Sequence, residues 1–436
     1  MCWMPCSVRA VTIFIAKRRS KLRRRRYPAV LLATLAAGSL FLHSVNSSAQ
    51  TPSQATPTEA QVEHGKYIAA AANCVSCHTR SGGAPFAGGR AFQTPFGTLY
   101  SSNITFDLVS GIGSWSRAAF ARAVREGVRP DGAHLFPAFP YTSFTQMTDE
   151  DVQAVYAYLK TLPRVNYQPP RNDLLLRQRW ALGPWKAQYF TARRFESNRA
   201  RSPEWNRGAY LVEALGHCGA CHSPRNRFMA EQTEQAFAGG TLWHEVEEGK
   251  VRRWSAVSLT SAPEGLATWS VADLEKYLAS GFSRRGGTFG PMNEVVVNST
   301  SHLSNEDVHA MAVYLKSVPG RSLASPVGST AGAGGSALYE KHCENCHGQS
   351  GRGGMFGGPP LAGSAVAQSG DPATLINVIL YGATVPQSLH LGAWETMKPY
   401  EKVLSDEEVA AVASYVRGAW SNRGGLVTAQ QVSEQR

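Results

Sequence analysis

The sequence predicts an all-α protein built from three tandem domains. Two repeated features support this organisation. A Cys-x-x-Cys-His motif occurs three times, beginning at Cys74, Cys218 and Cys343, and each copy is followed later by a segment with the pattern of an amphipathic helix. The chain has 436 residues, of which 43% are hydrophobic and 17% charged. This length suits about three domains of roughly 150 residues, each able to bury its own core.

The helix that ends each predicted domain begins at a recognisable cap. Thr148, Ser304 and Ser405 are each followed three residues later by Asp or Glu, which is the pattern of a capping box. Apolar residues fall four, seven, eight and eleven positions after each cap, so they form one stripe along a helix. Each helix also carries a Tyr ten positions after its cap: Tyr158, Tyr314 and Tyr415.

The repeated cysteine motif predicts covalent attachment of haem. Two residues between the thiols allow both sulfurs to reach the vinyl groups of one porphyrin, and the following His then faces the iron. A zinc site would need further ligands close by, a thioredoxin-like site would need a βαβ pattern, and a disulfide would not explain the His. We therefore expect three covalently bound haem c groups. The attachment and ligand residues are Cys74, Cys77, His78, Cys218, Cys221, His222, Cys343, Cys346 and His347.

Repeated segments and changes of composition set the expected boundaries. Phe86–Gly89 recurs as Phe237–Gly240, and a Pro- and Arg-rich connector containing Trp180 and Trp185 separates these copies. A Gly/Ser/Ala-rich stretch has the composition of a flexible linker. The expected parts are a signal peptide (1–49), repeat 1 (50–163), the connector (164–204), repeat 2 (205–319), the linker (320–335), repeat 3 (336–423) and a polar tail (424–436).

The first 49 residues have the order of a secretory signal. A basic run precedes an apolar stretch from Pro28 to Leu42 and the small residues Ser47–Ala49. We expect cleavage before Gln50 and export to the periplasmic face of the inner membrane; an uncleaved membrane anchor is the alternative interpretation. These 49 residues hold nine Lys or Arg and no Asp or Glu, so the net charge of +12 falls to about +3 without them. No nucleic-acid partner is therefore expected.

Methionines between each motif and the last helix are candidates for the sixth iron ligand, since thioether ligation raises the reduction potential. Met292 and Met397 hold this position in repeats 2 and 3, with core packing as the alternative. Repeat 1 has Phe139 in the corresponding loop, and Met147 stands directly before the helix cap. Met147 is a candidate ligand or a hydrophobic staple, His134 is a second candidate, and an open iron position is the third interpretation. His217 and His342 are interpreted as surface or packing residues.

The motifs and several longer stretches resemble the triheme cytochrome c subunit of membrane-bound periplasmic dehydrogenases that oxidise alcohols, gluconate, sorbitol, fructose or aldehydes. Similar subunits accompany molybdenum hydroxylases. The stretches are 141–151, 205–224 and 290–307. The resemblance implies three class I cytochrome c-like domains, each wrapped round one haem. It also implies a separate flavin, quinone or molybdenum subunit as electron donor, and ubiquinone or a terminal oxidase as acceptor. Many relatives carry Met where Phe139 stands, which leaves the coordination of the first haem open.

The residues themselves favour electron transfer over catalysis by this chain. No carboxylate pair, nucleotide-binding glycine motif or Ser/His/Asp spacing predicts substrate chemistry. A rival hypothesis is a multihaem enzyme, such as a peroxidase or a sulfur-compound dehydrogenase, that uses an open iron position in repeat 1. The segment from Leu426 to Arg436 is too short for a strong amphipathic anchor. We therefore expect only peripheral contact with the membrane, through partners or a weak surface patch.

The first testable prediction concerns the haem count. Because each motif supplies two thiols and one imidazole, the exported protein should carry three covalent haem additions in its intact mass. Mass spectrometry of the periplasmic protein measures this number directly. Fewer than three additions, or six free motif thiols, would contradict the prediction.

Overall fold

The structure is a computed structural model that describes residues 57–174, 179–247, 250–323, 333–354, 357–383, 394 and 396–436. All of them belong to one compact unit, Thr56–Arg436. The predicted signal peptide lies outside the described residues, as do four residues of the connector and most of the predicted linker. Among the described residues, none of the helices combines the length and the apolar character that a membrane crossing requires.

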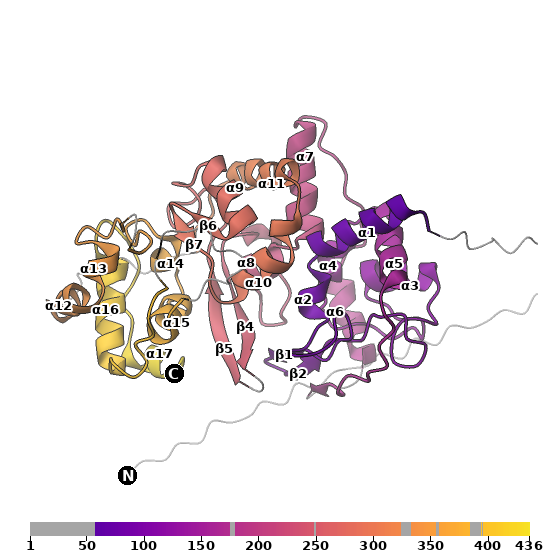
Figure 1. Cartoon of the computed structure of the whole chain (residues 1–436), viewed down its shortest axis with the longest axis horizontal. Coiled ribbons are helices and arrows are strands. Elements are labelled where there is room, and N and C mark those ends of the chain that lie inside the picture. Colours follow the sequence, from indigo (N-terminus) through magenta and orange to yellow (C-terminus); the bar gives the residue numbers. More distant parts are fainter. Residues whose placement is uncertain are drawn as a thin grey trace, which may run out of the picture. The chain divides into compact units, whose positions relative to one another are not determined.

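Helices dominate the chain, and short helical turns carry the three cysteine motifs (Figure 1). In repeat 1 and the connector the helices are α1 (Glu59–Ala71), α2 (Cys74–Cys77), α3 (Arg117–Glu126), α4 (Tyr141–Phe144), α5 (Asp149–Thr161), η1 (Arg179–Ala181) and α6 (Leu182–Tyr189). In repeat 2 they are α7 (Pro203–Ala209), η2 (Tyr210–Leu215), α8 (Gly219–His222), η3 (Thr233–Gln235), α9 (Val271–Ser280), α10 (Pro291–Asn298), η4 (Thr300–His302) and α11 (Asn305–Ser317). Repeat 3 and the tail hold α12 (Ala333–His342), α13 (Glu344–His347), α14 (Ala365–Gln368), α15 (Ala373–Tyr381), α16 (Asp406–Gly418) and α17 (Ala429–Ser433).

The expectation of an all-α fold is wrong in one respect, because the described residues also contain three small antiparallel sheets. Strands β1 (Ala91–Thr94), β2 (Gly97–Tyr100) and β3 (Asp173–Leu174) form the first sheet. The second is a hairpin of β4 (Gly240–Glu247) and β5 (Lys250–Ala256), and the third pairs β6 (Phe282–Ser283) with β7 (Gly286–Gly287). In β4 exposed Thr241 and Trp243 alternate with partly buried Leu242 and His244. This alternation is the period-two pattern of a half-buried strand.

The predicted helix caps are confirmed. The side chains of Thr148, Ser304 and Ser405 accept hydrogen bonds from the backbone N–H three residues later. The reciprocal bond of a complete capping box forms at Ser405. The corresponding carboxylates of α5 and α11, Asp151 and Asp307, instead accept hydrogen bonds from tyrosines of the other repeat. Long-range contacts therefore take up the groups that the local pattern assigned to the caps.

Two hydrophobic cores hold the described residues together. Repeats 1 and 2 share one core, which includes Ile68 and Leu159 from repeat 1 and Leu215 and Leu315 from repeat 2. Repeat 3 has a separate core. Val427 and Val432, in the segment predicted as a polar tail, are buried in this second core. The tail thus packs onto repeat 3.

One close helix crossing occurs in all three repeats. The first helix lies against the last helix in the pairs α1–α5, α7–α11 and α12–α16. A Gly stands at each crossing: Gly65, Gly208 and Gly335. A Cβ added at Gly65 would lie 1.9 Å from the carbonyl oxygen of Ala154, and one added at Gly208 would lie 1.9 Å from that of Ala310. At Gly335 the added Cβ would lie 2.4 Å from the carbonyl oxygen of Ala411. Each crossing also brings the Gly against the Cβ of the Tyr that follows ten positions after the cap. Only Gly leaves room for such an approach.

The crossing in repeat 3 offers a test with a matched control. Gly335→Ala should destabilise the protein by about 1–3 kcal/mol because the new methyl group overlaps the backbone of α16. Gly334→Ala changes the neighbouring position of the same helix, where an added Cβ meets nothing within 4 Å. This control should be neutral or slightly stabilising, since Ala favours helix. Thermal unfolding compares the two variants, and equal unfolding temperatures would contradict the packing argument.

Candidate haem sites

The three motif histidines are held in the same way. Nδ1 of His78 lies 2.7 Å from the carbonyl oxygen of Ser102, Nδ1 of His222 lies 2.7 Å from that of Val257, and Nδ1 of His347 lies 2.8 Å from that of Pro359. A carbonyl oxygen only accepts, so each Nδ1 carries the proton and Nε2 keeps its lone pair for a metal. Burial lowers the pKa of all three imidazoles, although the backbone hydrogen bond opposes it. The neutral form that an iron ligand needs is therefore favoured.

The motif cysteines are partly buried free thiols, in agreement with attachment sites rather than disulfides. Burial raises the pKa of Cys74 and Cys218 to about 12 and that of Cys343 to about 11, with a smaller contribution from the second thiol of each motif. The first thiol of each motif is accordingly protonated at neutral pH. Two free thiols and one neutral imidazole on one short turn fit the requirements of haem c.

Met292 lies at the start of α10, where Pro291 holds the first helical position. It lines a cavity together with Cys218, His217 and Leu211 of repeat 2 and with Asn73 of repeat 1. The thioether and the first motif thiol of repeat 2 therefore face the same space. The assignment of Met292 as a sixth ligand of the second haem stays a prediction.

Met397 lies in repeat 3, where its carbonyl oxygen accepts a hydrogen bond from the backbone N–H of Ala383 at 3.3 Å. The side chain is partly buried against the core of repeat 3. Three residues later, the hydroxyl of Tyr400 donates to the carbonyl oxygen of His342 at 2.7 Å, directly before Cys343. Burial and the nearby Cys343 and Cys346 raise the pKa of Tyr400. The Met397 segment is thus tied to the third motif.

The candidates in repeat 1 lie in different surroundings. Met147 is only 2% exposed and belongs to the core that repeats 1 and 2 share, which is the place of a packing side chain. His134 packs near Gly183 of α6, and burial together with Lys186 and Arg122 lowers its pKa. Phe139 packs on Phe144, with ring centroids 5.5 Å apart. The assignment of Met147 as a ligand stays a prediction, and packing explains its position.

Reciprocal hydrogen bonds join repeats 1 and 2, and the sequence analysis missed them. The hydroxyl of Tyr67 donates to Asp307 at 2.6 Å and accepts from the N–H of Ser304 at 3.1 Å. In the opposite direction, the hydroxyl of Tyr210 donates to Asp151 and accepts from the N–H of Thr148 at 3.2 Å. Each repeat thus binds the N-terminus of the other repeat's last helix, as in a two-fold symmetric pair.

A sequence signal for this pairing exists in the recurrence of Gly-x-Tyr at Gly65–Tyr67 and Gly208–Tyr210. Tyr67 precedes its motif by seven residues and Tyr210 by eight. The additional residue is accommodated in η2, which is a π-helix. His217, which the sequence analysis assigned to packing or the surface, lies in this junction and hydrogen-bonds to the backbone of Ala72.

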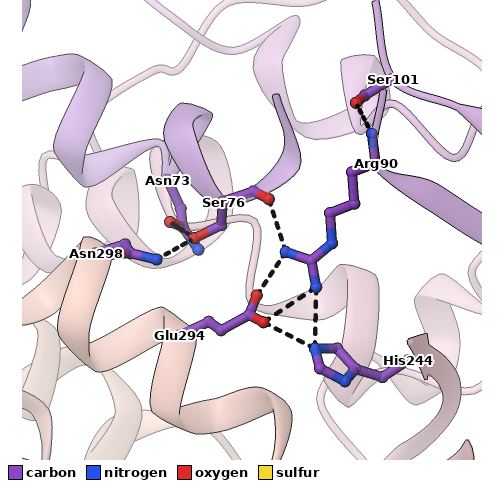
Figure 2. Close-up of polar contacts among 7 residues, drawn as sticks. All are labelled: Asn73, Ser76, Arg90, Ser101, His244, Glu294 and Asn298. Atoms are coloured by element: carbon purple, nitrogen blue, oxygen red, sulfur yellow. Dashed lines mark hydrogen bonds and ion pairs between the residues drawn. The ribbon is translucent and has the colours of Figure 1, made fainter. Parts of the chain in front are cut away.

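A second group of residues that the sequence analysis missed lies beside the first motif. Arg90 of repeat 1 contacts Glu294 and His244 of repeat 2 (Figure 2). None of these residues belongs to a repeated motif. The sequence signal for this group is a difference between the two copies of the Phe-Ala-Gly-Gly segment. Arg90 follows the first copy, whereas Thr241 follows the second.

Comparison with known proteins supports the haem sites. The family described as "Cytochrome c" matches residues 62–163. The family described as "Cytochrome C oxidase, cbb3-type, subunit III" matches residues 330–416. These matches cover the first and third motifs, and the close helix crossing of α7 and α11 provides the same framework around the second.

Relatives align along most of the chain. "Alcohol dehydrogenase (quinone), cytochrome c subunit" of Gluconacetobacter polyoxogenes is 38% identical over 427 residues, which cover 93% of this chain and 90% of that protein. "Gluconate 2-dehydrogenase cytochrome c subunit" of Pantoea cypripedii is 35% identical and covers 91% of this chain and 94% of its own length. The chain belongs to this family of dehydrogenase cytochrome c subunits. "Fructose dehydrogenase cytochrome subunit" of Gluconobacter japonicus is 34% identical over 448 residues, which cover 94% of this chain and 90% of that protein.

As a dehydrogenase cytochrome c subunit, the protein is an electron-transfer subunit and not the catalytic subunit of its complex. The cytochrome c domains imply covalently bound haem c. The free thiols and the hydrogen-bonded imidazoles of the motifs fit this implication.

The sixth ligands in this cytochrome subunit can be tested individually. Met292→Ala and Met397→Ala should each abolish the sulfur-to-iron charge-transfer band of one haem and lower its reduction potential, because the thioether favours ferrous iron. Spectra and redox titrations of the haem-loaded protein measure both effects. Met229→Ala is the control, since Met229 follows the second motif and does not line the cavity that holds Met292. Unchanged spectra in the first two variants would refute the assignments.

Proposed function

We propose that the protein is a three-haem relay that takes electrons from the catalytic subunit of a dehydrogenase and passes them to ubiquinone or a terminal oxidase. The observation that carries the proposal is the identical fixation of His78, His222 and His347 by backbone carbonyl oxygens. The family matches reach the first and third of these histidines. The second occupies the same place in repeat 2, so we assign one haem c domain to each of repeats 1, 2 and 3.

Bound haem c supplies one-electron redox chemistry. The chain's own residues determine how that chemistry is used. Cys74 and Cys77, with their counterparts in the other repeats, would attach the haem covalently. The hydrogen bond from Nδ1 to a backbone carbonyl oxygen holds each imidazole in the tautomer that leaves Nε2 free for the iron. The shared core of repeats 1 and 2 fixes the first two sites relative to one another.

The proposed location of the relay rests on the residue order of the first 49 residues. The basic, apolar and small-residue order of residues 1–49 supports export, with the mature protein working at the periplasmic face of the inner membrane. The relatives act in alcohol, fructose and gluconate dehydrogenases according to their names. A flavin-, quinone- or molybdenum-containing catalytic subunit is therefore the proposed donor, and contact with the membrane is proposed to be peripheral.

Substrate-driven haem reduction tests the relay function. The complex purified from its native membranes should reduce the haems of this chain when ethanol, gluconate or fructose is supplied, with one substrate class effective. The isolated, haem-loaded chain should remain oxidised with all three, because it holds no substrate chemistry of its own. Visible spectra record the reduction. Substrate oxidation or rapid peroxide turnover by the isolated chain would contradict the proposal and favour the multihaem enzyme.

A further inference from the structure

Arg90 stands at the junction of the first two haem sites. It follows Gly89 directly, at the edge of β1, and its guanidinium reaches both the first motif and repeat 2 (Figure 2). Nη1 donates to the carbonyl oxygen of Ser76, inside the motif, at 2.6 Å. The same nitrogen donates to Oε2 of Glu294 at 2.6 Å, and Nη2 donates to Oε1 of Glu294 at 3.1 Å. Arg90 therefore forms a bidentate ion pair across the junction.

The ion pair is shielded from water on the Arg90 side. The side chains of Arg90 and His244 are 15% exposed, and that of Glu294 is 36% exposed. Nε2 of His244 lies 3.0 Å from both Oε1 of Glu294 and Nη2 of Arg90, so His244 contacts both members of the ion pair. Burial opposes ionisation of Glu294, but the hydrogen bonds from His244 and Arg90 outweigh it and lower the pKa to about 2. Both members of the pair are thus charged at neutral pH.

The opposite end of α10 is tied to the same motif. Nδ2 of Asn298 donates to the hydroxyl oxygen of Ser76 at 2.9 Å, and this hydroxyl donates to Asn73 at 2.6 Å. Next along the chain, the hydroxyl of Ser299 donates to the carbonyl oxygen of Ala71 at 3.2 Å. The helix that presents Met292 to the second site is therefore held against the first motif by two groups of contacts.

The charges of the pair lie beside the attachment point of the first haem. Nη1 of Arg90 contacts the carbonyl oxygen of Ser76, which directly precedes Cys77, at 2.6 Å. The carboxylate of Glu294 contacts the same nitrogen at 2.6 Å. A cation near a haem favours the ferrous form because it offsets the electron that the iron gains, and an anion favours the ferric form. Arg90 and Glu294 thus act on the same site with opposite signs.

We propose that Arg90 is a positioning residue that holds α10 against the first motif and, through its charge, raises the reduction potential of the first haem, while Glu294 lowers it. The proposal rests on the relay function inferred above. The guanidinium of Arg225 donates to the carbonyl oxygen of Ala220 in the second motif at 2.8 Å, so the proposal concerns the potential of the first haem alone.

Single and double substitutions separate charge from packing. In spectroelectrochemical titrations of the haem-loaded full chain, Arg90→Gln should lower the midpoint potential of one haem and Glu294→Gln should raise that of the same haem. Each change should alter the oxidised-to-reduced ratio of this haem at a fixed potential by roughly tenfold. The double variant should return toward the wild-type value. Arg90→Lys should leave the midpoint potential of this haem close to the wild-type value, because the substitution keeps the charge and loses only the bidentate geometry.

The control is an ion pair in repeat 1 with little shielding. Arg122 and Glu126 are about half exposed and 3.6 Å apart on α3, so Arg122→Gln and Glu126→Gln should leave every haem potential unchanged. Loosening of a purely structural contact would shift the potential in the same direction in Arg90→Gln and Glu294→Gln. Shifts of the same sign, or none, overturn the proposal. The titrations need no dehydrogenase, so their outcome is independent of the test of the relay function.

Discussion

The close crossing of the first and last helices in each repeat is the constraint on which the haem sites depend. A Gly at positions 65, 208 and 335 allows the backbones of the two helices to approach more closely than any side chain would permit. The cysteine motif follows the first helix closely in repeats 1 and 3 and follows η2 in repeat 2, so the crossing determines where the thiols and the imidazole lie. Capping by Thr148, Ser304 and Ser405 then fixes the start of the second helix in each pair. Local chemistry at a few positions thereby defines the framework that is repeated.

The reciprocal tyrosines explain why repeats 1 and 2 form one body. Tyr67 and Tyr210 bind equivalent carboxylates of the opposite repeat, and Arg207 also pairs with one of them, Asp307, at 2.6 Å. Burial would raise the pKa of Asp307, yet the hydrogen bonds from Arg207 and Tyr67 hold it below its ordinary value. Both the shared core and these bonds oppose separation. The shared core and these bonds therefore hold the first and second motifs in a fixed relative position.

Sequence patterns predicted the features whose causes are local. The motif histidines, the caps and the apolar stripes depend on residues a few positions apart, and the structure contains all of the caps. The third sheet was missed because β6 and β7 have only two residues each, too few to show a period. The alternation in β4 was present in the sequence but was not used to predict a strand. The packing of the tail was missed because only Val427 and Val432 mark it. The carboxylates of Asp151 and Asp307 were assigned to the caps of their own helices. The tyrosines that bind these carboxylates lie far away in the sequence, so a pattern three residues long does not include them.

The position after the Phe-Ala-Gly-Gly segment contacts the following repeat in both repeats 1 and 2. Arg90 occupies it in repeat 1 and reaches Glu294 of repeat 2, whereas Thr241 occupies it in repeat 2 and donates to Asp371 of repeat 3 at 3.3 Å. Arg253, on the strand paired with β4, supplies the cation for Asp371. Each junction therefore sets a cation of the preceding repeat against a carboxylate of the following one. Repeats 1 and 2 share a core whereas repeat 3 keeps its own, so the same position belongs to a junction within one core in the first case and to a junction between two cores in the second.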